Sequence, residues 1–172
     1  CINASGRLES AIASLELLLE QDTDTAIAKA QEIRSINEER KEMTFRESER
    51  AIEYLEAASP MKIFVIYLPD CHESLAGIIA GRIRENYHHP VFVLVNSEEE
   101  GVLKGSGRSI PEYHMFEALQ ECSDLLLKFG GHAMAAGFSL SADCLEAFSD
   151  RLNELCDLTE DAFIPKVKID VP

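Results

Sequence analysis

The sequence has no tryptophan, and aromatic residues make up only 7% of its 172 residues. It also has no run of about 20 apolar residues, the length that a membrane-spanning helix needs. A basic N-terminal region followed by an apolar one, which would indicate a secretory signal, is missing as well. Apolar residues still make up 46% of the chain, a composition typical of a folded globular protein. We therefore expect a cytoplasmic protein without a membrane partner.

Cysteine pairs with metal-binding spacing are also lacking. The chain has five cysteines and no Cys-x-x-Cys motif. An odd number of scattered cysteines predicts neither a disulfide framework nor a thiolate zinc site. We expect them to be small buried side chains, which is common for free cysteine. They are Cys1, Cys71, Cys122, Cys144 and Cys156.

Positive charge is scarce, because the formal net charge is −15. Proteins bind nucleic acids largely through Lys and Arg, so this balance excludes an extensive basic groove. The segment GVLKGSGRSIP (101–111) nevertheless carries Lys104 and Arg108 and no acid. A small positive site within an acidic protein is compatible with this distribution.

The first third of the chain predicts helices. Residues 9–20 have apolar side chains at the spacing of one helical face. After a break at which Asp22 or Asp24 can cap a helix, residues 25–58 contain no Gly or Pro. A helix of that length would extend roughly 50 Å. Because it is polar on most sides, it either bridges two domains or lies solvated on its own domain.

The next segment predicts a β-strand, an α-helix and a second strand. The apolar, β-branched runs KIFVIYL (62–68) and VFVLV (91–95) are typical of buried strands, and residues 74–86 have a helical pattern. A βαβ unit of this length places its two strands parallel.

The remaining segments complete an α/β domain. Residues 102–110 predict a glycine-interrupted strand antiparallel to its predecessor, residues 112–127 a helix, 135–140 a strand, and 142–156 a helix capped by Ser141. We therefore expect an α/β fold with a mixed, mainly parallel sheet flanked by helices, preceded by a long helical N-terminal arm.

This pattern divides the chain into three parts. Residues 1–59 form the arm, 60–157 the α/β domain, and 158–172 a linker or the first strand of a following domain. Because the chain begins with Cys1 and ends with the strand-like IPKVKIDVP, we expect a segment of a longer protein.

Two glycine-containing motifs are candidates for anion binding. In GSGRS (105–109), main-chain N–H groups, the hydroxyl of Ser106 and the guanidinium of Arg108 can all face a phosphate. The structural alternative is a β-bulge in an edge strand. In GGH (130–132), Gly130 can end the preceding helix in a left-handed conformation, and His132 can donate a hydrogen bond to phosphate or polarise a leaving group. The alternative is a histidine buried in the core.

Two further segments place polar residues beside predicted helix starts. INASGRL (2–8) brings Arg7 to a position where helix N-termini favour anions, with Ser5 as an ordinary cap in the alternative interpretation. PDCHES (69–74) places His72 at the carboxyl end of the first strand, where open α/β sheets bind ligands. In its alternative, Ser74 caps the helix and His72 is merely exposed. His88 and His89, in a loop before Pro90, carry no predicted role.

No combination of residues predicts a metal site or a nucleophile. Two carboxylates at the spacing of a two-metal centre are missing, as are a Gly-x-Ser-x-Gly elbow and an oriented Cys/His pair. From its residues alone, the chain is a binding module.

Four segments in this order resemble the RecJ-type single-strand-specific DNA exonucleases of the DHH phosphoesterase superfamily. They are INASGRL, HESLAGIIAGRIRENYHHPVFVL, LKGSGRSI and FGGHAMAAGFSL, and the last three resemble the DHH-associated C-terminal domain. The resemblance implies that a DHH domain outside this chain holds two Mn²⁺ or Mg²⁺ ions. It implies no cofactor in this chain and no hydrolysis of DNA by this chain alone.

The resemblance also assigns residues. Arg7, Ser106 and Arg108 match positions around the 5′ phosphate, and Lys104 lies in the same segment. His132, the candidate catalytic residue, matches a substrate-facing loop that closes on the metal site, together with Gly130 and Gly131 as candidate substrate contacts. His72 matches a strand-end histidine, although Cys71 and Glu73-Ser74-Leu75 depart from the family pattern there.

The implied function is substrate binding in a 5′-to-3′ exonuclease that acts on 5′-phosphorylated single-stranded DNA through metal-activated water. Two alternatives remain open. One is a nano-RNase or cyclic-dinucleotide phosphodiesterase of the same superfamily. The other is a non-catalytic interaction module in which the helical arm is the functional part, and a dimer through that arm is compatible with either.

Overall fold

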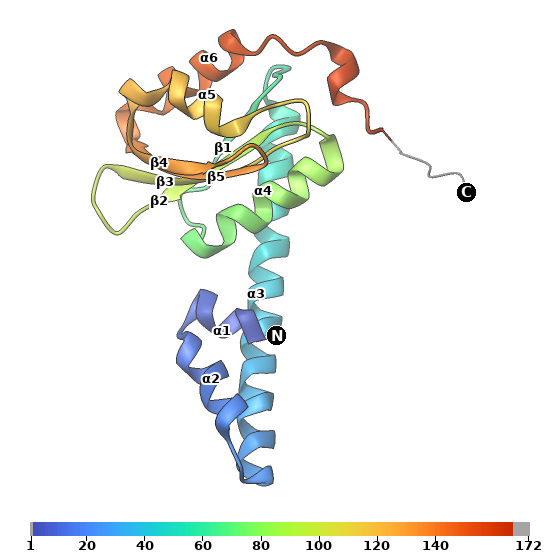
Figure 1. The fold of residues 1–172 in the computed structure, drawn as a ribbon, viewed down its shortest axis with the longest axis vertical. Helices are drawn as coiled ribbons and strands as arrows, with labels where there is room; N and C mark the ends of the chain where they lie inside the picture. Colours follow the sequence, from blue (N-terminus) through green and yellow to red (C-terminus); the bar gives the residue numbers. More distant parts are fainter. Residues whose placement is uncertain (1, 167–172) are drawn as a thin grey trace. The chain divides into compact units, whose positions relative to one another are not determined.

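The structure is a computed structural model that describes residues 2–166. The chain divides into two compact units, Cys1–Glu49 and Arg50–Pro172. The first unit contains α1 (Ile2–Leu8), α2 (Ala11–Leu19) and most of α3 (Thr23–Ala57), as Figure 1 shows. Among the described residues, none of the helices has the length and apolar character that crossing a membrane requires.

The second unit contains a five-stranded sheet and its covering helices (Figure 1). In chain order its elements are β1 (Phe64–Tyr67), α4 (Glu73–Tyr87), β2 (Val91–Asn96), β3 (Val102–Arg108), α5 (Met115–Glu121), the 3₁₀ turn η1 (Ser123–Leu125), β4 (Leu126–His132), β5 (Ala135–Ser141), the 3₁₀ turn η2 (Ala142–Cys144), α6 (Leu145–Leu155) and the 3₁₀ turn η3 (Glu160–Phe163).

Helices α2 and α3 lie close to the predicted ranges, whereas helix α1 was not predicted. Asp22 accepts a hydrogen bond from the backbone N–H of Thr25 at 2.9 Å, as predicted for a helix cap. The segment INASGRL is itself helix α1, so Ser5 is not the expected cap. Its hydroxyl is buried and lies 2.6 Å from that of Ser14, which joins α1 to α2. Ser10 caps α2 instead.

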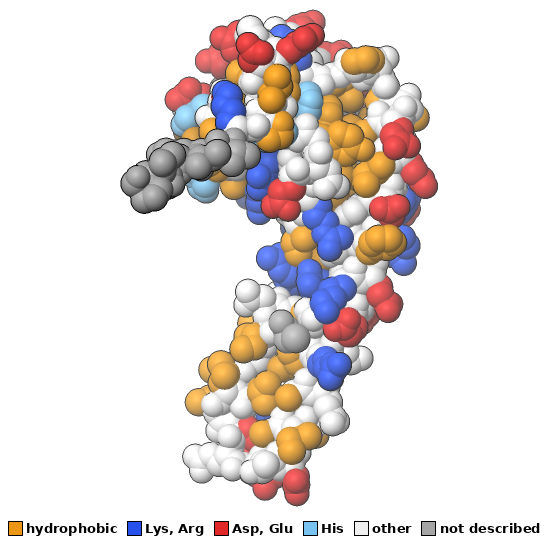
Figure 2. Space-filling view, turned by 90° about the vertical axis from the view of Figure 1, so that its right-hand side faces the viewer, with side chains coloured by type: hydrophobic (Ala, Val, Ile, Leu, Met, Phe, Trp, Pro, Cys, Tyr) orange, Lys and Arg blue, Asp and Glu red, His pale blue; other side chains and the backbone are white. Residues whose placement is uncertain are grey.

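The first unit has an exposed apolar surface, seen as orange side chains in Figure 2. Its large exposed hydrophobic residues are Ile2, Ile12, Leu15, Leu18, Leu19, Ile27 and Phe45. A dimer through this arm stays a prediction.

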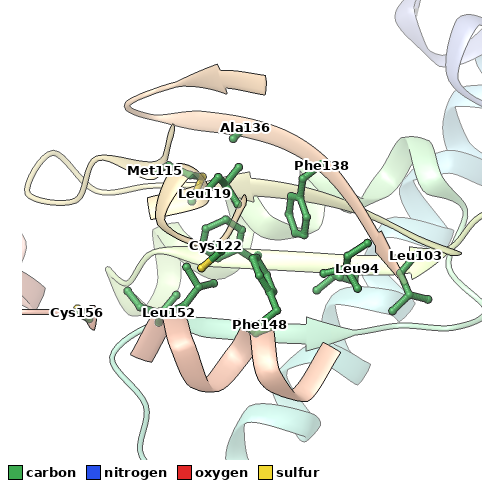
Figure 3. Close-up of a cluster of buried hydrophobic side chains, with 14 residues drawn as sticks. Leu94, Leu103, Met115, Leu119, Cys122, Ala136, Phe138, Phe148, Leu152 and Cys156 are labelled. Carbon is green, nitrogen blue, oxygen red and sulfur yellow. The ribbon is translucent and has the colours of Figure 1, made fainter. Parts of the chain in front are cut away.

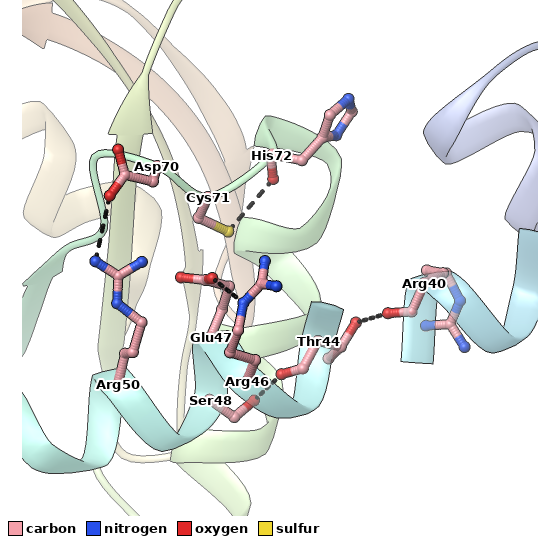
Figure 4. A network of polar contacts seen from close by, with 9 residues as sticks. All are labelled: Arg40, Thr44, Arg46, Glu47, Ser48, Arg50, Asp70, Cys71 and His72. Carbon is pink, nitrogen blue, oxygen red and sulfur yellow. Dashed lines mark hydrogen bonds and ion pairs between the residues drawn. The ribbon is translucent and has the colours of Figure 1, made fainter. Parts of the chain in front are cut away.

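Hydroxyl side chains within α3 bond back to the helix (Figure 4). Thr44 donates to the carbonyl of Arg40 at 2.7 Å, and Ser48 donates to that of Thr44 at 2.6 Å. In the part of α3 that belongs to the second unit, Arg50 pairs with Asp70 at 3.3 Å. This ion pair links the end of α3 to the loop before α4.

The sheet has the strand order β1-β2-β3-β5-β4, and only β1 and β2 are parallel. The predicted βαβ unit and the antiparallel return of β3 are confirmed. The prediction of a mainly parallel sheet was wrong, because β5 pairs antiparallel with both β3 and β4. The connection through α4 places β1 and β2 parallel, whereas β4 and β5 form a hairpin with a two-residue turn, which makes them antiparallel.

Strand β4 was not predicted from the sequence. The helix predicted over 112–127 ends at Glu121, and residues from Leu126 onward are extended. Gly130 therefore lies inside a strand, and its predicted role as a left-handed helix end was wrong. The terminal helix α6 is confirmed, although a 3₁₀ turn precedes it and the side chain of Ser141 makes no capping bond.

The core lies between the sheet and helices α5 and α6, as Figure 3 shows. Phe138 contacts Phe92 and Phe148 with ring centroids 5.6 and 5.0 Å apart. Helix α4 packs on the opposite face of the sheet, against β2 and β3. The second unit is therefore an α/β/α sandwich in which the buried faces of the strands are set by alternation along each strand.

Other buried groups complete the packing. Cys71, Cys122 and Cys156 are buried, as predicted, and Cys144 is half-buried. His89, for which no role was predicted, stacks between Phe64 and Phe163 with centroids 4.4 and 4.2 Å away. Most of the predicted strand IPKVKIDVP lies outside the described residues.

Candidate functional site: the open face of β3, β5 and β4

Strand β3 presents two different surfaces because side chains alternate along a strand. Leu103, Gly105 and Gly107 are buried toward the core. Lys104 is exposed on the other face, and Ser106 and Arg108 are half-buried there. Within the motif GSGRS, Gly105 and Gly107 thus face the core, whereas Ser106 and Arg108 face the other side of the sheet.

Core packing explains both glycines of this motif. A Cβ at Gly105 would overlap the ring of Phe138, and one at Gly107 would lie 2.9 Å from Cε of Met115. β3 has a neighbour on each side and its pairing has no irregularity, so the edge-strand bulge was wrong. Its main-chain N–H groups belong to the hydrogen-bonded pairing with β2 and β5. An anion could therefore be bound here by the side chains of Ser106 and Arg108.

Strand register aligns the polar residues of three strands in rows. Paired residues of antiparallel strands have their side chains on the same face. Each row contains one residue of β3, one of β5 and one of β4, in that order. The rows are Arg108, Ala135 and His132; Ser106, Gly137 and Gly130; and Lys104, Ser139 and Lys128. All nine positions are exposed or half-buried. We call these three rows the open face.

Helix α4 borders the open face and makes room for Arg108. A Cβ at Gly77 would lie 2.8 Å from Nη2 of Arg108, so the guanidinium occupies the place of a side chain there. Nη1 of Arg108 donates to the carbonyl of Gly107 at 2.7 Å. The guanidinium is thus held against the helix at one end of the open face.

A hollow of about 410 Å³ lies at the other end of the open face. Nζ of Lys104 is 2.5 Å from Oε2 of Glu73. The hydrogen bond and the negative charge of Glu73 raise the pKa of Lys104, so its ammonium stays charged. The residues that line the hollow are Glu73, Ser74, Ala76, Lys104, Gly105, Ser106, Lys128, Phe129, Gly137, Phe138 and Ser139.

His132 ends β4 and lies in the same row as Arg108. It is exposed, so the alternative of a core histidine was wrong. Its Nδ1 accepts a hydrogen bond from the N–H of Met134 at 3.3 Å. The turn between β4 and β5 is hydrogen-bonded to the residue after β3, because the N–H of Ser109 donates to the carbonyl of Met134 at 2.9 Å.

Gly131 has a structural reason to be glycine. Its φ is +151°, and a Cβ there would lie 2.6 Å from Cα of Ala136. Any residue with a Cβ would be strained at this position. Gly131 therefore shapes the hairpin that carries His132.

The last two predicted site residues lie elsewhere. His72 is exposed and caps α4: its Nδ1 accepts from the N–H of Ser74 at 3.3 Å, so Ser74 is not the cap. It precedes Glu73, which lines the hollow. Arg7 is in the last turn of α1, in the first unit.

Residues 2–166 contain no group of three His, Cys, Asp or Glu side chains that could hold a metal ion. The two-metal centre that the resemblance implies therefore does not fit the described part of this chain. What the open face offers is cations and hydroxyl groups, which bind anions.

Residues 61–157 match the family model of the DHHA1 domain, so the chain belongs to the DHHA1 domain family. It is 38% identical over 173 residues to the single-stranded-DNA-specific exonuclease RecJ of Bacillus subtilis, covering 99% of this chain and 22% of that protein. It is also 38% identical over 166 residues to RecJ of Escherichia coli, covering 90% and 28%. The resemblance to RecJ exonucleases is confirmed, and the chain spans roughly a quarter of these relatives.

Solved structures of RecJ are also similar to this chain. A crystal structure of RecJ from Thermus thermophilus in complex with Mg²⁺ has a TM-score of 0.79 and 35% identity, covering 89% of this chain and 24% of that chain. A crystal structure of exonuclease RecJ bound to manganese has a TM-score of 0.80 and 34% identity, covering 94% and 40%. The fold is therefore shared with the corresponding region of RecJ.

Several residues of the open face were not among the predicted site residues, notably Lys128, Gly137 and Ser139. All three belong to the β4–β5 hairpin, of which β4 was not predicted. Residues 128–132 show no alternation of period two that could have indicated the strand, because Gly130 and Gly131 are identical and Phe129 is the one large apolar residue among them.

Proposed function

We propose that this chain binds the DNA strand in a 5′-to-3′ single-stranded-DNA exonuclease, with the open face holding the 5′ phosphate. The observation that supports this most is the row that brings Arg108 and His132 together at one end of the open face. Guanidinium and imidazole N–H groups are donors suited to phosphate oxygens. The relatives that match most of this chain are named as single-stranded-DNA-specific exonucleases.

The charge of the chain is consistent with a small phosphate site. The net charge is −15, but the open face carries Lys104, Arg108 and Lys128, and Glu73 is the acid that lines the hollow. A few cationic contacts suffice to fix the position and direction of a strand, because phosphate contacts set register.

Hydrolysis would take place in a part of the protein outside this chain. The solved relatives are described as complexes with Mg²⁺ and with manganese, whereas the described residues here offer no metal-binding group. In this proposal His132 and Ser106 donate hydrogen bonds to the phosphate, and Arg7 and His72 are further substrate contacts. The chain alone has no nuclease activity.

The test is binding of a 5′-phosphorylated oligothymidylate to the chain, measured by fluorescence anisotropy at low salt. Arg108→Ala is expected to weaken binding about 10-fold, the order of one charged hydrogen bond. Arg82→Ala is the matched control, because Arg82 is an exposed arginine on α4 that lies outside the open face. Equal losses in the two variants would contradict the phosphate assignment.

The same assay separates the alternative substrates. A 5′-hydroxyl oligonucleotide should bind more weakly than its phosphorylated form, and a cyclic dinucleotide should compete poorly. A cyclic dinucleotide that competes as well as the phosphorylated strand would favour the phosphodiesterase alternative. Absence of binding to every nucleotide would favour the interaction module.

A further inference from the structure

The central row of the open face contains two glycines that the fold does not require. Gly130 and Gly137 are paired across β4 and β5. Neither has a positive φ, and a Cβ would meet nothing within 4 Å at Gly130 and only the carbonyl of Gly105, at 3.9 Å, at Gly137. By contrast, Gly131 is required by its backbone.

Glycine inside a strand weakens it and often marks a place where a ligand approaches the main chain. Both glycines are exposed on the open face. Together they leave a strip of bare main chain between two rows of polar side chains. This strip is the part of the face that a ligand can approach most closely.

The row at the far side of this strip consists of Lys104, Ser139 and Lys128. It provides two ammonium groups and a hydroxyl, all donors. Lys104 forms an ion pair with Glu73. Lys128 is exposed, and among residues 2–166 it has no ion-pair partner.

The two polar rows are four residues apart along each strand, which is about 14 Å at ~3.4 Å per residue. A stacked nucleic-acid strand advances only about 3.4 Å per nucleotide. One phosphate therefore cannot contact both rows, and the second row is suited to a phosphate further along the same strand.

We propose that Lys128, with Ser139 and Lys104, forms a second phosphate subsite for an internal phosphate of the bound strand. Nucleotides between the two phosphates lie over the bare main chain of Gly130 and Gly137. This inference rests on the proposed function, since it takes the row of Arg108 and His132 as the site of the end phosphate.

The experiment compares a 5′-phosphorylated dinucleotide with a 5′-phosphorylated hexanucleotide of thymidine, both in the anisotropy assay. Lys128→Ala is expected to weaken hexanucleotide binding about 5-fold and to leave dinucleotide binding unchanged. It should also reduce the slope of log affinity against log salt by about 0.7, the value for one phosphate contact on a single strand. Arg108→Ala should weaken both ligands.

Gly137→Ala separates a binding role from a structural one. The added methyl group has space in the free protein, so the midpoint of urea unfolding should stay the same or rise. Hexanucleotide binding should fall at least 3-fold because the methyl group occupies the strip. Gly81→Ala is the control: position 81, on α4, also has open space, and binding should not change.

The outcomes distinguish the two proposals. If Arg108→Ala weakens binding but Lys128→Ala and Gly137→Ala do not, the second subsite is wrong and the end-phosphate site stands. If Lys128→Ala weakens dinucleotide and hexanucleotide equally, Lys128 contributes only general charge, which also overturns the inference. If Arg108→Ala has no effect, the proposed function itself fails.

Discussion

The guanidinium of Arg108 occupies the space that a side chain at position 77 would need, because a Cβ there would lie 2.8 Å from its Nη2. Gly77→Ala should therefore displace the end of Arg108 without disturbing the core, since that end is flexible. We expect binding of a 5′-phosphorylated oligonucleotide to weaken several-fold. The unfolding free energy should stay equal or rise by up to about 1 kcal/mol, as for Gly→Ala in a helix.

Gly81→Ala tests whether this effect belongs to Arg108. It makes the same change four residues further along α4, where a Cβ meets no atom within 4 Å. Stability should respond similarly in the two variants, as measured by urea unfolding. Equal binding by both variants would show that Arg108 does not need its place beside Gly77.

The ion pair between Lys104 and Glu73 predicts a gain of binding. Glu73 places a carboxylate at the hollow, 2.5 Å from Nζ of Lys104. Glu73→Gln removes a negative charge that would repel phosphate and releases Lys104 for the ligand. We expect roughly 2- to 3-fold tighter oligonucleotide binding at low salt, with the gain lost at high salt because exposed charges are screened.

The control for this prediction is Glu85→Gln, an exposed glutamate near the other end of the same helix. It changes the net charge equally but lies outside the residues that line the hollow. A gain of equal size in both variants would mean that total charge, rather than the position of Glu73, controls affinity.

The sequence predicted the βαβ unit correctly because its strands are buried on both faces and form continuous apolar runs at 62–68 and 91–95. It did not predict β4, which is an edge strand. Only Leu126 and Phe129 of β4 are half-buried, and the rest is exposed. An apolar run is therefore missing there, and helix-forming residues upstream extended the predicted helix too far.

The site residues predicted from the sequence stay predictions, but the structure changes the reason for the glycines among them. The two glycines of GSGRS suggested main chain around an anion, whereas Phe138 and Met115 explain them as close packing in the core. Sequence alone could not show this, because it depends on which residues of other elements lie opposite the strand. Lys128 was missed for the same reason: its neighbours in the row come from pairing between strands.

A side-chain amide stabilises the start of β1. Oδ1 of Asn153, on α6, accepts hydrogen bonds from the N–H groups of Lys62 and Ile63, both at 3.0 Å. Its Nδ2 donates to the carbonyls of Ile63 and Ser149, also at 3.0 Å. Asn153→Ala should lower the unfolding free energy by about 2 kcal/mol, because main-chain groups lose their partners. Urea unfolding measures this.

Asn153→Asp gives a graded comparison. It keeps the acceptor for Lys62 and Ile63 but loses both donors, so it should be destabilised less than Asn153→Ala. Glu154→Ala, at the exposed neighbouring position, is the control and should change stability by less than about 0.5 kcal/mol. If Asn153→Ala lowers the unfolding free energy by no more than Glu154→Ala does, the amide of Asn153 does not stabilise β1.

His89 makes the stability of the second unit depend on pH. It stacks between Phe64 and Phe163, and its Nδ1 lies 2.9 Å from the carbonyl of Lys62. Burial disfavours its charged form and lowers its pKa below the ordinary value of 6.5, although the hydrogen bond to Lys62 opposes this shift. Below pH 6.5 the unfolded chain therefore binds more protons at His89 than the folded chain does. The stability that neutral His89 contributes is complete above pH 6.5 and is lost as the pH falls below 6.5.

The measurement is the midpoint of urea unfolding at about pH 7.5 and about pH 5.5, on either side of the ordinary histidine pKa. His89→Phe can keep the stack but does not titrate, so its midpoint should fall less than that of the wild type. If wild type and His89→Phe lose stability equally, the titration of His89 does not act on folding, and the fall comes from other titratable groups that both proteins share.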